Sequence, residues 1–337
     1  MSRIFYRGQL RYLGCYFYRC LLPLQQLGYQ GDLLTIRSVP NPAEISKGIM
    51  DAEIVVMHRP FEKASKDLFL ALREGGKKLV IDGDDTYNVE KSEDIMKLGS
   101  MASAMSNSIN WFLREADLVT CTNEFLADEY RKLNKNVVVL PNYINPEDFP
   151  KVQRNKTKKV RIGIIGSVGL NNTNDVENIK DIIKELSERK DVTLVLFGQS
   201  PDVGFWKDIK LEYHTFVHMA DYYQKLSDLK LDMAIIPRRD TYFNRAKSNV
   251  KFLECSMLEI PCICQSWGDG KSPYDPDKDY VLLANKPKEW KHEIDELIKD
   301  KELRKMMGTR AKKYVVANYS IIKNAYRWKD EYNKLLE

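Results

Sequence analysis

Short apolar runs recur along the chain and alternate with stretches in which apolar residues have the 3.6-residue spacing of an α-helix. The runs lack the polar alternation of a half-exposed strand, which is typical of strands buried in a parallel sheet. In the first half of the chain, strands are predicted over residues 4–7, 33–37, 53–57, 78–81, 118–121 and 137–140. Helices are predicted between them, near residues 14–28, 60–74, 93–115 and 124–133. Strands that alternate with helices predict a parallel sheet covered on both faces.

The same alternation restarts after a short polar stretch at residues 155–159, which is interpreted as a linker. A long helical run extends from about residue 289 to residue 337, with an interruption near Asn318 and Tyr319. The pattern therefore predicts two doubly wound α/β domains, residues 1–155 and residues 156–318. In the second domain, strands are predicted over 161–165, 192–197, 214–217, 233–236 and 261–264, with helices near 176–189, 222–229 and 244–254.

The helix predicted over residues 244–254 connects two of the predicted buried strands. Lys247, Lys251 and Glu254 have the spacing of one helical stripe. Such a helix begins at the carboxyl end of a strand, where backbone N–H groups and the helix dipole favour phosphate. Lys247 would therefore meet a diphosphate, and Glu254, further along the same face, would meet the hydroxyls of a ribose. The alternative interpretation is an ordinary surface helix with a solvated face of lysine and glutamate.

The composition is that of an ordinary globular protein, with 337 residues of which 43% are hydrophobic and 30% are charged. The net charge of +5 arises from 53 basic and 48 acidic residues, so it is compatible with anionic substrates but does not by itself indicate nucleic-acid binding. No apolar run approaches the roughly 20 residues of a membrane span, and the N-terminus lacks the apolar core of a signal peptide. The six cysteines lack the spacing of a zinc site, and reduced thiols in the cytoplasm are expected.

Three glycines, Gly163, Gly166 and Gly169, lie in and just after the strand predicted over residues 161–165. A glycine at the end of a strand indicates that the backbone closely approaches a ligand or another segment. The spacing is not the G-x-G-x-x-G of dinucleotide sites, and no acidic residue ends the next predicted strand. A nicotinamide cofactor is therefore disfavoured.

Three carboxylates, Asp82, Asp84 and Asp85, follow the strand predicted over residues 78–81. Recognition of the hydroxyl groups of a ligand is the preferred interpretation, with a capping turn or a metal ion as the alternatives. His58 follows another predicted strand at the same edge of the sheet. No Ser-His-Asp or Cys-His nucleophile set is evident.

The segment from Asp232 to Pro261 resembles the donor-site segment of the retaining, family-4-like glycosyltransferases of group 1. Its Phe-Asn-x-Ala-Lys-Ser motif, residues 243–248, resembles that of one subgroup. Other pieces resemble the family in the same order, namely EIVVMHRP at 53–60, KLVIDGDD at 78–85, DLVTCTNEFLA at 117–127 and VLPNYI at 139–144. Tyr18 and Arg19, followed by Pro23 and by Leu27 and Gly28, resemble the family's first helix, and the last helix, with Trp328, resembles its final segment. The resemblance therefore covers nearly the whole chain, with its pieces in the family's order.

The resemblance implies the GT-B fold, in which two doubly wound, Rossmann-like domains face an interdomain cleft. Residues 1–155 would bind the acceptor, residues 156–318 would bind the nucleotide-sugar donor, and residues 319–337 would form a helix that crosses back to the N-terminal domain. The family's donor motif contains two glutamates. Glu254 matches the one that holds the ribose, whereas Ala246 stands where the other is expected.

The resemblance also implies roles for individual residues. Lys247 and Arg245 would stabilise the leaving diphosphate, and Asp84 and Asp85 would act on the acceptor side. The residues expected to bind the donor are Gly166, Ser167, Arg238, Asn244, Lys247, Ser248, Asn249 and Glu254. No metal ion or other cofactor is expected, because relatives with this fold hold the diphosphate with side chains and helix ends.

The function that the resemblance implies is transfer of a sugar, with retention of configuration, from a UDP- or GDP-linked donor to an acceptor hydroxyl in the cytoplasm. The sequence leaves the acceptor open among a glycan, a lipid-linked sugar, a protein and a hydroxymethylated DNA base, and it leaves peripheral membrane attachment open. Two alternatives remain. One is a sugar-nucleotide epimerase of the same fold, which needs no acceptor. The other is a non-catalytic module that binds a sugar nucleotide or a glycan, which the absence of a glutamate at Ala246 keeps open.

Overall fold

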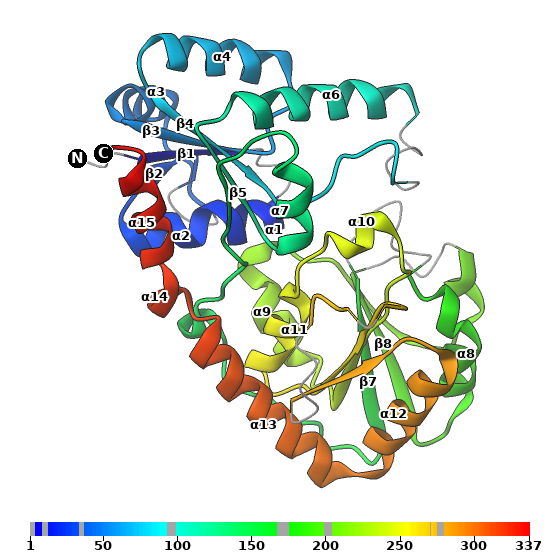
Figure 1. Cartoon of the computed structure of the whole chain (residues 1–337). Helices are drawn as coiled ribbons and strands as arrows, with labels where there is room; N and C mark the ends of the chain where they lie inside the picture. Colours follow the sequence, from blue (N-terminus) through cyan, green and yellow to red (C-terminus); the bar gives the residue numbers. More distant parts are fainter. Residues whose placement is uncertain are drawn as a thin grey trace. The chain divides into compact units, whose positions relative to one another are not determined.

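The computed structural model describes residues 4–8, 13–33, 37–92, 99–166, 175–198, 204–269, 271–274 and 280–337. The chain forms two compact units. Unit 1 contains residues 1–145, 241–248 and 321–337, and unit 2 contains residues 146–240 and 249–320. Each unit has its own six-stranded parallel sheet with helices on both faces (Figure 1). The predicted α/β fold with two Rossmann-like domains is therefore confirmed.

Unit 1 is built around a sheet with the strand order β2-β1-β3-β4-β5-β6. Its strands are β1 (Ile4–Gly8), β2 (Gln30–Gly31), β3 (Ile54–His58), β4 (Lys78–Gly83), β5 (Leu118–Cys121) and β6 (Val137–Val139). Its helices are α1 (Leu13–Tyr16), the π-helix η2 (Phe17–Leu21), α2 (Leu22–Leu27), α3 (Pro42–Asp51), α4 (Lys63–Glu74), α6 (Ser100–Glu115), α7 (Glu124–Tyr130), α10 (Tyr242–Arg245), α14 (Ile321–Asn324) and α15 (Tyr326–Lys334). Helices α3, α4 and α6 cover one face of the sheet, and α1, α2 and α15 lie on the other (Figure 1).

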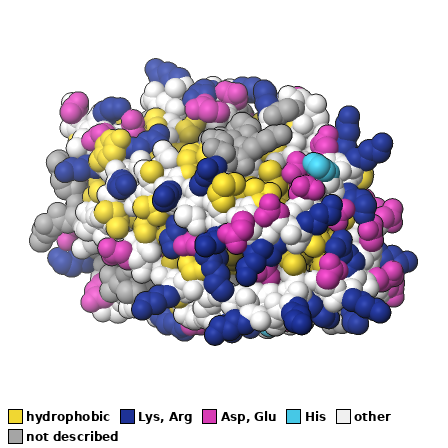
Figure 2. Space-filling model, turned by 90° about the horizontal axis from the view of Figure 1, so that it is seen from below, with side chains coloured by type: hydrophobic (Ala, Val, Ile, Leu, Met, Phe, Trp, Pro, Cys, Tyr) yellow, Lys and Arg dark blue, Asp and Glu magenta, His cyan; other side chains and the backbone are white. Residues whose placement is uncertain are grey.

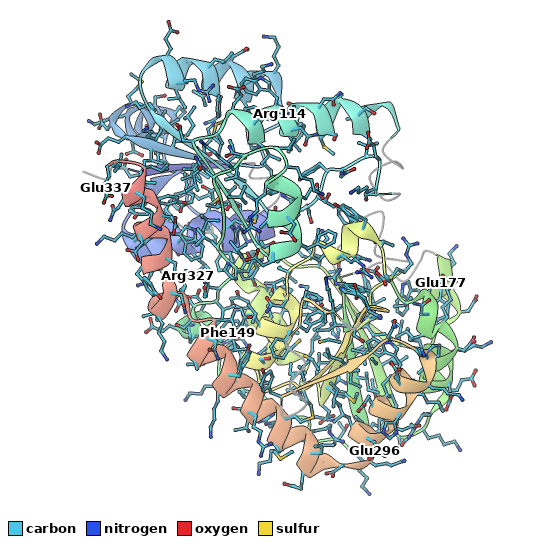
Figure 3. The ribbon with its side chains drawn as sticks, viewed as in Figure 1. Arg114, Phe149, Glu177, Glu296, Arg327 and Glu337 are labelled. Carbon is cyan, nitrogen blue, oxygen red and sulfur yellow. The ribbon has the colours of Figure 1, made fainter. Side chains whose placement is uncertain are left out.

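The C-terminal helix α15 packs on the sheet of unit 1. The hydroxyl of Tyr332 lies 2.8 Å from that of Tyr6 on β1. Arg327, labelled in Figure 3, donates to the Val139 carbonyl at 3.2 Å and also to the Tyr143 hydroxyl. These contacts explain why residues 321–337 belong to unit 1 although most of the preceding chain belongs to unit 2.

Unit 2 is built around a sheet with the order β12-β11-β10-β7-β8-β9. Its strands are β7 (Val160–Ile165), β8 (Val192–Gly198), β9 (Glu212–Thr215), β10 (Met233–Ile236), β11 (Cys262–Gln265) and β12 (Val281–Ala284). Its helices are η3 (Pro146–Asp148), η5 (Glu177–Ile179), α8 (Lys180–Glu188), η6 (Gly204–Asp208), α9 (Met219–Asp228), α11 (Val250–Met257), α12 (Pro287–Lys299) and α13 (Lys301–Asn318). Trp290 of α12 and Ile183 of α8 are fully buried in one apolar cluster with the strands.

The apolar runs locate most strands within two residues of their observed positions. The predicted strand 33–37 falls mainly on residues 34–36, which lie outside the described part of the chain, and β2 is found before it. The pattern does not predict α3 or β12. The long C-terminal helical run is interrupted near residue 318 as predicted, but also at Asp300, whose side chain caps α13 by accepting from the Leu303 N–H at 2.8 Å.

The first boundary between the units differs from the predicted linker at residues 155–159, because the chain joins unit 2 at Pro146. The intervening residues are already tied to that unit. The ring of Phe149, labelled in Figure 3, stacks on Tyr223 with centroids 3.9 Å apart. The Ser227 hydroxyl donates to the Lys151 carbonyl at 3.2 Å. The predicted linker itself is also tied to unit 2, since Nδ2 of Asn155 donates to Oδ2 of Asp232 at 2.6 Å.

The surface carries charges of both signs. On the face drawn in Figure 2, Lys and Arg side chains are interspersed with Asp and Glu, which is consistent with 53 basic and 48 acidic residues in the sequence. Within the described ranges, none of the helices combines the length and the apolar character that crossing a membrane requires.

Candidate functional site

In the sheet of unit 2, the order in which the chain adds strands reverses at β7. The chain places β8 and β9 on one side of β7, and β10, β11 and β12 on the other. Ligands of doubly wound sheets bind outside the carboxyl ends of the strands at such a switch point. Gly166 directly follows β7, and Arg238 lies two residues after β10. Two of the predicted donor-binding residues are therefore at the edge where the topology favours a nucleotide.

Gly166 takes part in a close approach of two backbone segments. Its N–H donates to the Phe197 carbonyl at 3.0 Å. A Cβ on Gly198 would lie 2.1 Å from the Gly166 carbonyl oxygen, and Gly198 has a φ of 102°. Only glycine fits position 198, both in conformation and in space. Sequence reasoning missed Gly198, although a glycine that ends a buried strand is a recognisable signal. The predicted residue Ser167 lies outside the described residues.

Arg238 is fixed at the same edge by several contacts. Its Nη1 atom lies 3.7 Å from Oδ2 of Asp175, and its backbone N–H donates to Oε1 of Gln265 at 3.4 Å. Burial raises the pKa of the Tyr274 phenol, and the charge of Arg238 opposes that rise. The Arg238 side chain is 15% exposed. Contact of Arg238 with a phosphate stays a prediction.

Glu254 is buried on α11, with only 2% of its surface exposed. Its Oε2 atom accepts from the Tyr222 hydroxyl at 2.9 Å and from Nζ of Lys251 at 3.1 Å. The Tyr222 ring stacks on Phe197 with centroids 5.4 Å apart, and burial together with the nearby carboxylate raises the pKa of Tyr222. The two donors compensate for the lost hydration of the carboxylate. Sequence reasoning did not find Tyr222, which is far from Glu254 in the chain.

Lys247 does not lie on the helix that carries Glu254. Residues 246–249 separate α10 from α11, so the continuous helix predicted over residues 244–254 is wrong. The common helical stripe predicted for Lys247 and Glu254 is wrong for the same reason, although Lys251 and Glu254 do interact along α11. A periodic pattern predicts one helix here because it does not register local caps and long-range anchors.

The break between α10 and α11 has a cause at the end of α10 and another at the start of α11. Thr241 caps α10 by accepting from the N–H of the buried residue Asn244 at 3.1 Å, and α10 ends at Arg245, whose N–H donates to the Thr241 carbonyl at 3.0 Å. Ser248 and Asn249 then disfavour helical continuation. Asn249, which is buried, is the N-cap of α11 but makes no capping hydrogen bond with its side chain.

Residues 241–248 pack as part of unit 1. Nδ2 of Asn123 donates to the Ala246 carbonyl at 2.8 Å, and Nδ2 of Asn142 donates to the Ser248 hydroxyl at 2.9 Å. The rings of Phe125 and Tyr242 contact edge to face with centroids 4.9 Å apart. Asn123 and Asn142 lie within two segments that resemble the family, but the sequence does not indicate that they hold this segment.

The ammonium group of Lys247 is paired with Asp85, at 2.5 Å from its Oδ1 atom. It also lies 4.1 Å from the centroid of the Phe243 ring, a favourable cation–π distance. The Lys247 side chain keeps 25% of its surface exposed. The structure therefore brings together two of the residues predicted to be catalytic, Lys247 and Asp85, within unit 1.

Arg59 connects Asp85 to Asp84. Its Nε atom donates to Asp84 and its Nη2 atom to Asp85. His58 Nε2 lies 3.3 Å from Asp84 Oδ1. Burial would raise the pKa of the Asp84 carboxyl, but Arg59 and His58 hold it well below its usual range. Arg59 has a φ of 49°, a conformation that costs a non-glycine residue energy, and sequence reasoning quoted it only as part of a motif.

Asp82 has a different environment from Asp84 and Asp85. Its two carboxylate oxygens accept from Arg19, Oδ1 from Nε at 2.9 Å and Oδ2 from Nη2 at 2.6 Å. Oδ2 also accepts from the Thr120 hydroxyl at 2.6 Å. Asp82 is 1% exposed and Arg19 is fully buried. Asp82 is therefore a core residue, and the acceptor role remains a prediction for Asp84 and Asp85 only.

Metal coordination was an alternative for these carboxylates. Across the ranges that the structure describes, there is no group of three or more His, Cys, Asp or Glu side chains arranged to hold a metal ion. Asp82, Asp84 and Asp85 instead accept from arginine and lysine side chains. The donor set of this turn therefore does not favour a cation.

The burial of Ala246 explains why the family's glutamate is absent at position 246. This alanine is fully buried and belongs to the apolar core of unit 1, together with Leu126 and Ala127 of α7. A carboxylate there would replace a packed methyl group with a buried charge. In this chain the position is an anchor for the segment 241–248 rather than a ligand-facing residue.

Ala246→Glu is therefore expected to destabilise unit 1 by about 3–5 kcal/mol, because a buried charge without a partner is costly. Urea denaturation followed by circular dichroism measures this. Ala104→Glu, at an exposed position of α6, is the matched control and should change stability by less than about 0.5 kcal/mol. A stable Ala246→Glu variant with tighter donor binding would show instead that position 246 faces the ligand.

Comparison with known proteins supports the family resemblance. Residues 177–330 match the family model described as "Glycosyl transferase-like". An uncharacterised glycosyltransferase of Methanocaldococcus jannaschii is 24% identical, with 80% of this chain and 71% of the relative covered. N-acetyl-alpha-D-glucosaminyl L-malate synthase of Bacillus anthracis is 23% identical, with 67% of this chain covered. The chain spans 61% of that synthase, less than two thirds of its length.

Solved structures show the same fold. HepE of Anabaena, in complex with UDP-glucose, is similar with a TM-score of 0.69 at 10% identity, covering 99% of this chain and 100% of that chain. Sucrose-phosphate synthase of Thermosynechococcus elongatus is similar with a TM-score of 0.63 at 12% identity, covering 87% of this chain and 77% of that chain. The chain therefore has the GT-B fold, and the family-model match together with the named relatives supports a glycosyltransferase activity. The segment that matches the family model contains Arg238, Lys247 and Glu254.

Proposed function

We propose that this protein moves a sugar, with retention of configuration, from a UDP- or GDP-linked donor to an acceptor hydroxyl. The observation that carries the proposal is the edge of unit 2, where the switch in strand order coincides with Gly166, Arg238 and the start of α11. The names of two similar proteins support it, since HepE was solved with UDP-glucose and the synthase of Bacillus anthracis carries an α-glycosyl product in its name.

Unit 2 holds the nucleotide in this proposal. Glu254 is preoriented by Tyr222 and Lys251 and accepts from the ribose hydroxyls. The backbone at Gly166 and Ser167 approaches the sugar or the diphosphate, and Arg238 contributes positive charge. The first turn of α11, after Asn249, offers N–H groups to the phosphates. No metal ion is required in this proposal, because side-chain cations and the helix end supply the positive charge.

The chemical step relies on stabilising the leaving group. The acceptor oxygen attacks the anomeric carbon while the bond from that carbon to the diphosphate oxygen breaks, and the departing phosphate takes the acceptor proton. Lys247, with Arg245 and Ser248 beside it in the chain, pairs with the negative charge that develops on the phosphate. Asp85 orients Lys247 through their ion pair. Asp84 acts with Asp85 by fixing Arg59.

The acceptor is assigned to unit 1. Its class stays open among a glycan, a lipid-linked sugar, a protein and a hydroxymethylated DNA base. Peripheral attachment to a membrane and a cytoplasmic location likewise remain proposals.

Product analysis tests the proposed reaction. The full chain is incubated with UDP-glucose, UDP-N-acetylglucosamine or GDP-mannose, each with and without a pool of acceptors, and proton NMR follows the anomeric signals. We expect a new α-glycoside and free nucleotide diphosphate only when an acceptor is present. A β-linked product contradicts retention. Nucleotide and altered free sugar without an acceptor indicate an epimerase, and binding of a donor without any turnover indicates a binding module.

Glu254→Gln is expected to raise the KM for the donor about 10- to 100-fold and to change kcat little. The ribose hydroxyls do not change during the reaction, so their contacts contribute equally to the ground and transition states. A hydrogen bond to a charged group is worth about 1.5–3 kcal/mol, which sets this range. Steady-state kinetics measure it, with Glu293→Gln on α12 as the control. An unchanged KM in a folded Glu254→Gln variant excludes ribose binding by this residue.

A further inference from the structure

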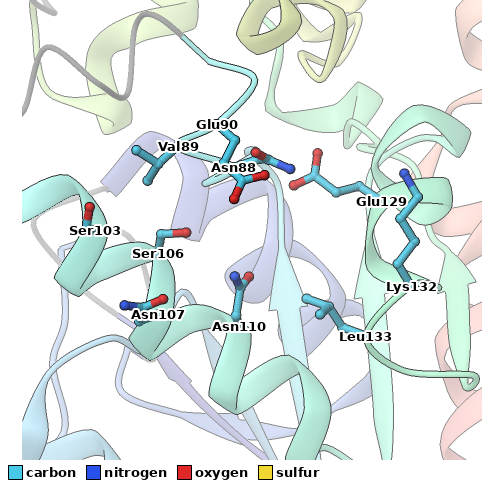
Figure 4. A pocket seen from close by; sticks show the side chains of 10 residues that line it. All are labelled: Asn88, Val89, Glu90, Ser103, Ser106, Asn107, Asn110, Glu129, Lys132 and Leu133. Carbon is cyan, nitrogen blue, oxygen red and sulfur yellow. The ribbon is translucent and has the colours of Figure 1, made fainter.

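Unit 1 contains a polar cavity that none of the roles above uses. It has a volume of about 380 Å³, within the range of small-molecule pockets, and it lies between the segment after β4, helix α6 and the end of α7 (Figure 4). Its walls carry amides, hydroxyls and a few charges. The lining residues are Asn88, Val89, Glu90, Ser103, Ser106, Asn107, Asn110, Glu129, Lys132 and Leu133.

The wall formed by α6 has an unusual composition for a helix surface. Residues 100–113 contain no charged residue, although 30% of the chain is charged. Ser103, Ser106, Asn107 and Asn110 follow the i, i+3, i+4, i+7 spacing of one helical face and point toward the cavity (Figure 4). Serine and asparagine are weak helix formers, and an ordinary solvated face would be occupied by Lys, Glu or Ala. The helix therefore keeps these residues at a cost in stability, which indicates a use for them.

The hydroxyl and amide groups on this wall make no hydrogen bonds to other described side chains or backbone groups. Ser106 is 7% exposed, and its hydroxyl, which solvent still reaches, has no hydrogen-bond partner among the described residues. The same holds, across the described ranges, for the side chains of Ser103, Asn107 and Asn110. Polar groups that face a cavity without a partner in the protein are left to water or to a ligand.

The opposite wall is fixed in place. Oε1 and Oε2 of Glu129 accept from the Thr86 hydroxyl at 2.8 and 2.9 Å. Oδ1 of Asn88 accepts from the Lys91 N–H at 3.1 Å, so its Nδ2 group is left for other contacts. Glu129 also hydrogen-bonds to Tyr242. Burial, first, and this carboxylate, second, raise the pKa of the Tyr242 phenol. Tyr242 begins α10, in the segment that carries Lys247.

We propose that this cavity binds a neutral sugar of the acceptor through its hydroxyl groups. Amides, hydroxyls and carboxylates supply both donors and acceptors, as a polyol requires, and each sugar hydroxyl both donates and accepts. With Glu90, Glu129 and Lys132, the lining has more negative than positive charge, which disfavours a phosphate or a nucleic-acid backbone. Through Tyr242, the sugar would be connected to the segment that holds Lys247. Only the identification of this sugar as the acceptor rests on the proposed function, because the cavity could bind the sugar without any transfer.

The test uses the full chain without any nucleotide sugar. Saturation-transfer difference NMR is recorded with the methyl glycosides of glucose, galactose, mannose and N-acetylglucosamine, and with glucose 6-phosphate as the charged counterpart. The test variant is Asn107→Ala with Asn110→Ala, which removes two amides and raises helix propensity, so folding is preserved. Asn333→Ala, at an exposed position of α15, is the matched control.

We expect at least one neutral glycoside to bind at millimolar concentration, the double variant to weaken it at least tenfold and Asn333→Ala to leave it unchanged. Glucose 6-phosphate should bind no more tightly than the neutral sugars. Absence of any signal, equal binding by the double variant or preference for the phosphorylated sugar overturns the proposal. Binding of UDP and of GDP, measured by calorimetry on the same samples, keeps the two proposals apart. Sugar binding without binding of either nucleotide overturns only the proposed function, and nucleotide binding without sugar binding overturns only this inference.

Discussion

Replacing Lys247 with alanine is expected to lower kcat by about two to three orders of magnitude while changing the donor KM much less. The Lys247 ammonium is the cation assigned to the leaving diphosphate, whose negative charge grows as the glycosidic bond breaks. An interaction that strengthens in the transition state affects kcat, and loss of one such donor typically costs about 10²–10³ in rate. Steady-state kinetics with the best donor measure the change. Lys63→Ala, an exposed lysine of α4, is the matched control.

The ion pair between Asp85 and Lys247 allows a second test of the role of Lys247. The Asp85 carboxylate holds the ammonium of Lys247 and is itself held by Arg59. If Asp85 acts by orienting Lys247, then Asp85→Asn lowers kcat, Asp85→Glu restores part of it, and Asp85→Asn adds little to a Lys247→Ala background. If Asp85 instead recognises the acceptor by itself, the losses of the two single variants multiply. The double-mutant cycle therefore separates the positioning role from the acceptor role that the sequence suggested.

A wild-type rate in a folded Lys247→Ala variant would remove Lys247 from the chemistry. Circular dichroism establishes folding in each variant. Asp85 then keeps only its ion pair with Arg59 and a role in the stability of unit 1.

The sheets were predictable from the sequence for a simple physical reason. Strands such as β4 and β10 are buried on both faces, so they appear as short apolar runs that need no knowledge of their neighbours. The edge strand β2 has only two residues, and its signal is too weak to locate. The resemblance to group 1 glycosyltransferases then supplied the fold name, and the similar solved structures confirmed it.

Residues of the candidate site were predictable only where their position follows from neighbouring residues in the sequence. Glu254 lies on a helix after a strand, as predicted, but its partner Tyr222 comes from α9. Lys247 was assigned to the same helix because periodicity does not register the anchoring of Ala246 in the core of unit 1. Asp82 looked like its neighbours Asp84 and Asp85 in sequence, and only its partner Arg19, 63 residues away, shows that it is a core residue. Long-range partners of this kind leave no local pattern.

Because Asp82 depends on this partner, Arg19→Met is expected to have a large effect on stability, a loss of about 3–5 kcal/mol in unit 1. Arg19 is fully buried and donates to Asp82, to Asn142 Oδ1 at 3.2 Å and to the Leu140 carbonyl at 2.5 Å. Removing the guanidinium leaves the Asp82 carboxylate buried without its charge partner, which is the costly way to break such a pair. Asn142 also holds Ser248, so the segment that carries Lys247 should loosen as well.

Hydrogen exchange of peptides from β4 and β5 measures this loss in unit 1 alone, without assuming that both units unfold together. Arg114→Met, at the exposed end of α6 (Figure 3), is the matched control and should change stability by less than about 0.5 kcal/mol. Adding Asp82→Leu to Arg19→Met should recover part of the loss, because removing both charges relieves the unpaired carboxylate, although the acceptors on Leu140 and Asn142 stay unsatisfied. If the double variant is less stable than Arg19→Met, the Asp82 carboxylate is stabilised chiefly by Thr120 and its surroundings, and the ion pair does not hold β4 to η2.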